Sequence, residues 1–122
     1  MHPWLSRLRH DLVKRVLWPA RDLRDASREP TAAELAELRR GVFELRDGEG
    51  HPMTARELWR RMCTDAPPLA PAALDSFAAA LTAAEREVGK LTAQPERWRH
   101  AVEAVLRIEP AFDALARTLE AE

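Results

Sequence analysis

The chain has 122 residues, a length at which one modest hydrophobic core can form without disulfide bonds or structural metal ions. Hydrophobic residues make up 46% and charged residues 32%, which is the balance of a folded protein and excludes a disordered tail. The formal net charge of −1 argues against indiscriminate binding to phosphate backbones. We therefore expect a single helical domain over residues 1–122.

Residue usage favours helices throughout the chain. The polar residues are mainly Arg and Glu and the apolar residues mainly Leu, Ala and Val, and most of these are strong helix formers. Only four Gly occur, and the nine Pro cluster between periodic stretches, where they separate one helix from the next. The predicted fold class is all-α, a compact bundle of about five to six short amphipathic helices.

The charge is distributed unevenly along the chain. Residues 1–24 carry six basic and two acidic side chains, a net charge of +4, whereas the remaining residues carry 13 basic and 18 acidic side chains, a net charge of −5. We therefore divide the domain into a basic amphipathic N-terminal helix over residues 1–24 and an acidic helical body over residues 31–120.

The first predicted helix spans residues 4–17, where apolar residues recur at helical spacing. Pro19 is expected to end this helix, to kink it, or to start a short second piece that reaches Leu23. The apolar arc is broad, so the helix either lies between several neighbours or keeps part of the arc for a partner. Its apolar residues are Trp4, Leu5, Leu8, Leu12, Val13, Val16 and Leu17.

A capping box predicts where the second helix begins. The Thr31 side chain can accept a hydrogen bond from the Glu34 amide while the Glu34 carboxylate accepts one from the Thr31 amide. Gly41 costs roughly 1 kcal/mol relative to Ala inside a helix, and an alternative ends the helix there and makes residues 42–46 extended. We favour a continuous helix, with an apolar stripe of Leu35, Leu38, Val42 and Leu45.

Residues 47–52 are predicted to form a turn, and a second capping box at residues 54–57 opens a third helix. Its inner face holds Leu58, Trp59, Met62 and Cys63. A proline-rich connector over residues 65–71 leads to the clearest amphipathic stripe of the chain. The residues of that stripe are Leu74, Phe77, Leu81, Ala84, Val88 and Leu91.

Two further helices are predicted near the C-terminus. Pro95 suits the first turn of the fifth helix, and Pro110 marks a break or kink before the last one. The fifth helix is expected to bury Trp98, Ala101, Val102, Val105 and Leu106, and the last one Phe112, Leu115 and Leu119.

Two clusters of polar residues invite a functional reading. Glu96, His100 and Glu103 follow the spacing i, i+4, i+7 and could offer ligands to a metal ion, but no Glu-x-x-His pair of a di-iron bundle occurs, so we favour a solvated charged face. His10 and Asp11, with Lys14, could perform acid-base chemistry. Since no nucleophile is placed near them by the sequence, we favour a non-enzymatic protein over an enzyme. We expect no cofactor.

Cys63 is the only cysteine, so no intrachain disulfide can form. A lone thiol fits a reducing compartment, and its place on an apolar helix face favours a buried structural role. Charged residues interrupt the N-terminal apolar residues before they could form a signal or a membrane span. We therefore expect a cytoplasmic protein.

The N-terminal helix is the element most suited to binding. Its apolar arc, its tryptophans and its positive charge favour a protein partner or a second copy of the chain, at a surface of Trp4, Arg7, Leu8, Lys14, Arg15 and Trp18. A ligand- or metal-binding bundle is the first alternative, and nucleic-acid or membrane-surface binding the second. Packing of this helix on the protein's own acidic body also stays open.

Overall fold

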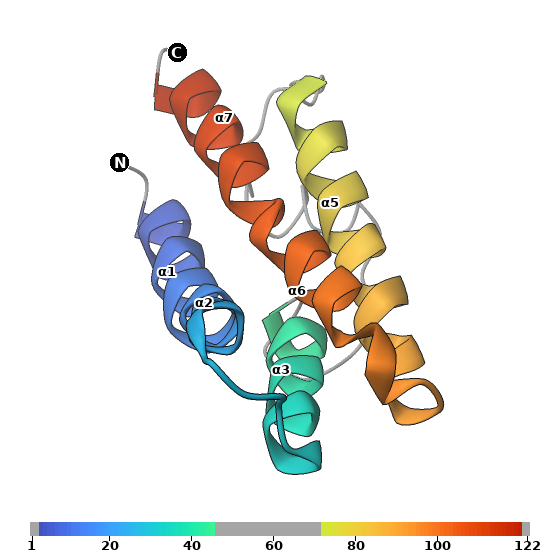
Figure 1. The fold of residues 1–122 in the computed structure, drawn as a ribbon. Coiled ribbons are helices and arrows are strands. Elements are labelled where there is room, and N and C mark those ends of the chain that lie inside the picture. Colours follow the sequence, from blue (N-terminus) through green and yellow to red (C-terminus); the bar gives the residue numbers. More distant parts are fainter. Residues whose placement is uncertain (1–2, 46–71, 121–122) are drawn as a thin grey trace.

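The computed structural model describes residues 3–45 and 72–120, apart from the side chains of residues 3–5, 7, 8, 45, 119 and 120 (Figure 1). Within these two ranges every regular element is helical and no strand occurs, so the predicted all-α class is confirmed. The predicted number of about five to six helices is not matched exactly within these ranges. The turn, capping box, helix and connector predicted within residues 46–71 lie outside the described residues.

The N-terminal segment is helical throughout and is built from three consecutive pieces. It consists of α1 (Pro3–Leu12), the π-helix η1 (Val13–Leu17) and α2 (Trp18–Asp25), and the backbone stays helical at both junctions. Pro19 is the second residue of α2, directly after the π-helix. Of the three outcomes expected at this proline, the structure therefore shows the short second piece.

The capping box of α3 (Ala32–Leu45) forms as predicted. The Glu34 amide donates to Thr31 Oγ1 at 3.2 Å, and the Thr31 amide donates to Glu34 Oε1 at 2.9 Å. The helix continues through Gly41 to its end. The continuous helix is thus confirmed, and the extended alternative for the residues after Gly41 is wrong up to residue 45.

The C-terminal half contains three longer helices joined by short turns. They are α5 (Ala72–Gly89), α6 (Trp98–Leu106) and α7 (Ile108–Glu120), and the 3-10 turns η2 (Lys90–Thr92) and η3 (Pro95–Arg97) join α5 to α6. Only Arg107 separates α6 from α7, and its amide still donates to the Glu103 carbonyl at 3.1 Å. Pro110 therefore falls in the first turn of α7 and not at the break itself.

The hydrophobic core lies between α5 and the other helices. This helix packs against α3, α6 and α7, while the N-terminal segment packs against α3 and α6 (Figure 1). Phe77 of α5 and Phe112 of α7 meet edge to face, with ring centroids 5.8 Å apart and an interplanar angle of 61°, a favourable aromatic geometry. All six residues of the stripe predicted for α5 and its following turn are buried.

The N-terminal segment contributes a second part of the same core. Its buried side chains are Leu12, Val16, Leu17, Ala20 and Leu23. Val13, Trp98 and Leu106, expected on apolar faces, pack against the core but remain partly exposed. None of the helices in the described ranges is long and apolar enough to cross a membrane.

Candidate functional site

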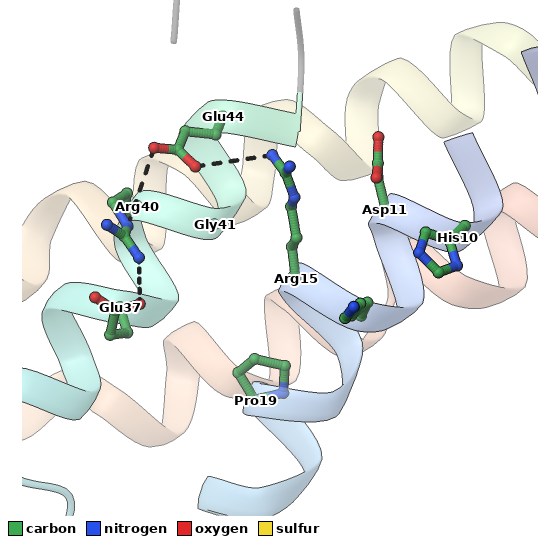
Figure 2. A pocket seen from close by; sticks show the side chains of 9 residues that line it. His10, Asp11, Arg15, Pro19, Glu37, Arg40, Gly41 and Glu44 are labelled. Atoms are coloured by element: carbon green, nitrogen blue, oxygen red, sulfur yellow. Dashed lines mark hydrogen bonds and ion pairs between the residues drawn. The ribbon is translucent and has the colours of Figure 1, made fainter. Parts of the chain in front are cut away.

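A pocket with a volume of about 560 Å³ lies between the N-terminal segment and α3 (Figure 2). We call it the charged pocket, because seven of its nine lining residues carry ionisable side chains. The α3 wall follows the spacing i, i+3, i+4, i+7, which is one helix face. The lining residues are His10, Asp11, Lys14, Arg15 and Pro19 from the N-terminal segment, and Glu37, Arg40, Gly41 and Glu44 from α3.

The π turn in the N-terminal wall has a local cause in Pro19. In a regular α-helix the N–H of this residue would bond to the Arg15 carbonyl, but proline has no N–H and its ring clashes with that carbonyl. A π turn bonds each N–H to the carbonyl five residues earlier, as the Trp18 amide does with the Val13 carbonyl. The wider turn thus lets the helix continue past the proline. Such turns frequently occur at functional sites.

Gly41 lies where the two walls of the pocket come closest. A Cβ atom at this position would lie 2.4 Å from the Arg15 carbonyl oxygen and 3.3 Å from the carbonyl carbon. Any other residue would therefore force the N-terminal segment and α3 apart. The glycine that weakens α3 locally is the residue that permits this close approach of two backbones.

The α3 wall and Arg15 are connected by exposed ion pairs (Figure 2). Glu44 lies between two guanidinium groups, with Oε2 3.9 Å from Arg15 Nη1 and Oε1 4.0 Å from Arg40 Nε. Arg40 Nη2 also donates to Glu37 Oε2 at 2.6 Å. Because these side chains are 40% to 63% exposed, each pair contributes only about 0–1 kcal/mol. The network orders the wall but leaves it accessible.

The three residues considered for acid-base chemistry all line the charged pocket. Figure 2 shows His10 and Asp11 toward the end of the pocket opposite Glu37. Within residues 3–45 and 72–120, their side chains and that of Lys14 make no hydrogen bond or ion pair. An imidazole used as a catalytic base needs a partner that orients it. The arrangement therefore offers free charges and no oriented acid-base pair.

The residues predicted to bind a partner divide into three groups. The side chains of Trp4, Arg7 and Leu8 lie outside what the structure describes. Lys14 and Arg15 line the charged pocket. Trp18 does not line it, and this side chain is 55% exposed, the only large hydrophobic one so exposed among the described residues.

Part of the positive charge of the N-terminal segment is neutralised within the molecule. Arg21 forms an ion pair with Glu109 of α7, and Arg15 pairs with Glu44 of α3. Through these ion pairs and its buried apolar side chains, the segment packs on the acidic remainder of the protein. Lys14 and Trp18 take no part in them and stay exposed.

The residues of the metal alternative are not brought together. Glu96 lies in the 3-10 turn η3, whereas His100 and Glu103 lie in α6, and all three side chains are exposed. The tighter 3-10 turn changes the direction of Glu96 relative to the α-helix that follows. In the part of the chain that the structure describes, no group of three or more His, Cys, Asp or Glu side chains could hold a metal ion.

Three carboxyl groups among the described residues have lowered pKa values, and none of them lines the charged pocket. A hydrogen bond from Arg24 lowers the pKa of Asp25. Hydrogen bonds from Arg28 and from the Thr31 amide lower the pKa of Glu34 to about 2. Burial of Glu87 opposes ionisation, but Lys90 and Arg97 outweigh this effect and lower the pKa of Glu87 below its ordinary value. All three groups lie near helix ends and pair with neighbouring basic side chains or a backbone amide, so none marks a reactive site.

The sequence pattern singled out His10, Asp11 and Lys14 of the N-terminal wall but no residue of the α3 wall. The polar side of the first helix was visible from its spacing, but nothing local connects it with Glu37, Arg40 and Glu44. Comparison with known proteins finds no matching family model, no matching curated protein and no matching solved structure. Functional inference therefore depends on the geometry alone.

Proposed function

We propose that this protein is a non-enzymatic interaction module that binds a protein partner, or a second copy of itself, through its N-terminal segment. The observation that carries the proposal is the exposure of Trp18, at 55%. A tryptophan buries a large apolar area on contact, and tryptophans are enriched among the residues that dominate binding energies. An exposed one on a folded helix is thus suited to anchor a partner.

The surroundings of Trp18 support this role. Lys14 and Asp22 lie four residues before and after it, and both side chains are exposed. An apolar centre with a charged rim is the usual composition of a protein interface. The buried side chains on the opposite face of the segment, such as Val16 and Leu23, hold the helix in place. Trp18 is therefore presented by a rigid element, which lowers the entropy lost on binding.

The non-enzymatic part of the proposal rests on the charged pocket. His10 and Asp11 are not hydrogen-bonded to each other, and no Ser, Thr or Cys is among the described residues that line the pocket. We place the module in the cytoplasm, since a single thiol at Cys63 fits a reducing compartment. A homodimer is one of the two forms of partnership that the experiment distinguishes.

The proposal is tested with Trp18→Asp, which replaces the anchor by a charge. Ala79→Asp is the matched control, because Ala79 is also an exposed helical position but lies in α5. The molar mass of each protein is measured by light scattering over a range of concentrations. In parallel, each variant is purified at native abundance and the proteins recovered with it in stoichiometric amounts are quantified.

We expect wild type and Ala79→Asp to keep a dimer or a stoichiometric partner that Trp18→Asp loses, with all three proteins equally helical by circular dichroism. Loss of dimer mass would identify a second copy as the partner. If Trp18→Asp behaves like the control in both measurements, the proposal is wrong. If only Trp18→Asp unfolds, Trp18 serves the fold and the proposal is equally wrong.

A further inference from the structure

The two walls of the charged pocket carry opposite net charges. Counting His10 as neutral, the N-terminal wall combines Asp11 with Lys14 and Arg15 for a net charge of +1. The α3 wall combines one arginine with two glutamates for a net charge of −1. The pocket is half open, and its volume of about 560 Å³ leaves room for a small molecule. The space between the walls is therefore electrically polarised across its width.

Both walls keep charged groups that a ligand could use. Lys14 has three N–H donors and no hydrogen bond or ion pair within the described residues. The contacts of Glu44 with Arg15 and Arg40, at 3.9 and 4.0 Å, are longer than hydrogen bonds. Glu37 Oε2 accepts a hydrogen bond from Arg40 at 2.6 Å, and its other carboxylate oxygen has no hydrogen bond within the described residues. Lys14 and this oxygen are therefore available to a ligand without breaking a close contact.

The distance between the walls is set by backbone packing. Gly41 meets the Arg15 carbonyl so closely that the N-terminal segment and α3 cannot approach further. Val16 and Val42, next to these two residues in the sequence, are fully buried in the core. The walls therefore cannot collapse onto each other when the pocket is empty, and a ligand would meet a site that is already formed.

We propose that the charged pocket binds a small zwitterion, a molecule with a carboxylate and an ammonium group at opposite ends. The carboxylate contacts Lys14 on the N-terminal wall and the ammonium group contacts Glu37 on the α3 wall, while Arg15 and Glu44 keep their ion pair. Polyanions are disfavoured because three carboxylates line the pocket, and polycations are disfavoured by its three basic side chains. Lys14 belongs both to the pocket and to the rim of the Trp18 surface, but Trp18 itself does not line the pocket, so substitution of Trp18 separates the two proposals.

The test uses three probes that differ only in charge: ε-aminocaproate, caproate and hexylamine. Each is titrated into the isotope-labelled full chain at low ionic strength, and the amide resonance of Gly41 reports on the pocket. We expect saturable shifts with ε-aminocaproate, and affinities at least about tenfold weaker for caproate and hexylamine, since each lacks one charge-assisted contact. Equal shifts with all three probes, or no saturable shift, would overturn the proposal.

Charge reversal provides the second test. Lys14→Glu and Glu37→Lys each make both walls alike in sign, so each should lose the binding of ε-aminocaproate. The double variant K14E/E37K exchanges the polarity of the walls and should restore binding with the ligand reversed. Arg107→Glu changes the net charge as Lys14→Glu does but lies at an exposed joint outside the pocket, and should bind as wild type does.

The reversed side chains are exposed, so the variants are expected to fold, and circular dichroism checks this. Unchanged binding in both single variants contradicts the proposal, as does a double variant that folds but binds no better than either. Trp18→Asp should leave the titration unchanged. A failure of the interaction module and a failure of the pocket are therefore observed separately.

Discussion

The N-terminal segment and α5 are both amphipathic helices, yet they differ in regularity. Helix α5 runs from Ala72 to Gly89 without interruption, and one stripe of it is buried in the core. The N-terminal segment widens into a π turn, meets α3 at a glycine and leaves Trp18 exposed. In α5 the helical spacing of the apolar residues agrees with their burial. In the N-terminal segment a proline interrupts the regular hydrogen bonds and a large apolar side chain stays exposed. Such departures from local sequence preferences concentrate at functional sites. The N-terminal segment is therefore the better candidate for a functional surface.

The largest loss of stability is expected from a substitution in the buried stripe of α5. Phe77→Ala removes a fully buried ring that packs on Phe112. We expect the free energy of unfolding to fall by about 3–5 kcal/mol, the usual cost of deleting a buried aromatic side chain. Urea denaturation followed by circular dichroism measures it. A loss below about 1 kcal/mol would mean that α5 is not the centre of the core.

The second largest loss of stability is expected at Gly41, where α3 and the N-terminal segment come closest. Gly41→Ala places a Cβ atom 2.4 Å from the Arg15 carbonyl oxygen, so we expect a loss of about 1–3 kcal/mol, as for other overpacked sites. Gly89→Ala is the control, because its nearest neighbour would be Phe43 Cζ at 4.0 Å and its φ is −64°. Alanine should there be neutral or stabilising by up to about 1 kcal/mol.

Both glycine variants are compared with wild type by urea denaturation under identical conditions. The two substitutions are chemically the same, so helix propensity alone would move both stabilities in the same direction. We expect Gly41→Ala to lower the free energy of unfolding and Gly89→Ala to leave it unchanged or raise it. If Gly41→Ala were as stable as Gly89→Ala, the close approach of the N-terminal segment to α3 would be refuted.

The smallest effect concerns the start of α3, which follows local rules as α5 does. Because the pKa of Glu34 is lowered from 4.5 to about 2, its ionised form stabilises the folded state. That contribution is complete above the ordinary pKa and is lost as the pH falls from about 4.5 toward about 2. NMR titration of the Glu34 carboxyl checks the pKa. Glu34→Gln should flatten the pH dependence of stability in this range, and an unchanged profile would contradict the assignment.

Much of the fold could be predicted from the sequence because it depends on short-range patterns. The Thr31 capping box and the stripe containing Leu74 and Phe77 involve residues three or four positions apart, and the structure confirms both. Three outcomes were expected at Pro19, and the structure shows one of them, the start of a short second helical piece. The π turn itself was not foreseen, because its signal is an absent N–H that several helix geometries could accommodate.

The candidate site could be predicted only in part. The polar side of the first helix pointed to His10, Asp11 and Lys14, and these residues do line the charged pocket. The opposite wall comes from α3, more than twenty residues later in the chain, and no local pattern links Glu44 with Arg15. The ion pair between Arg21 and Glu109 joins residues 88 positions apart, and no local pattern predicts it either.

Local patterns were enough to predict that the described chain is helical, where α3 begins, and which faces of α3 and α5 are apolar, because helix period and capping act within one or two turns. Which helices meet, what surrounds the charged pocket, and that Trp18 stays outside the core depend on contacts between distant parts of the chain. Gly41 illustrates the difference. Within its own helix it is a weakness, and only the Arg15 carbonyl across the gap shows that a side chain there has no room.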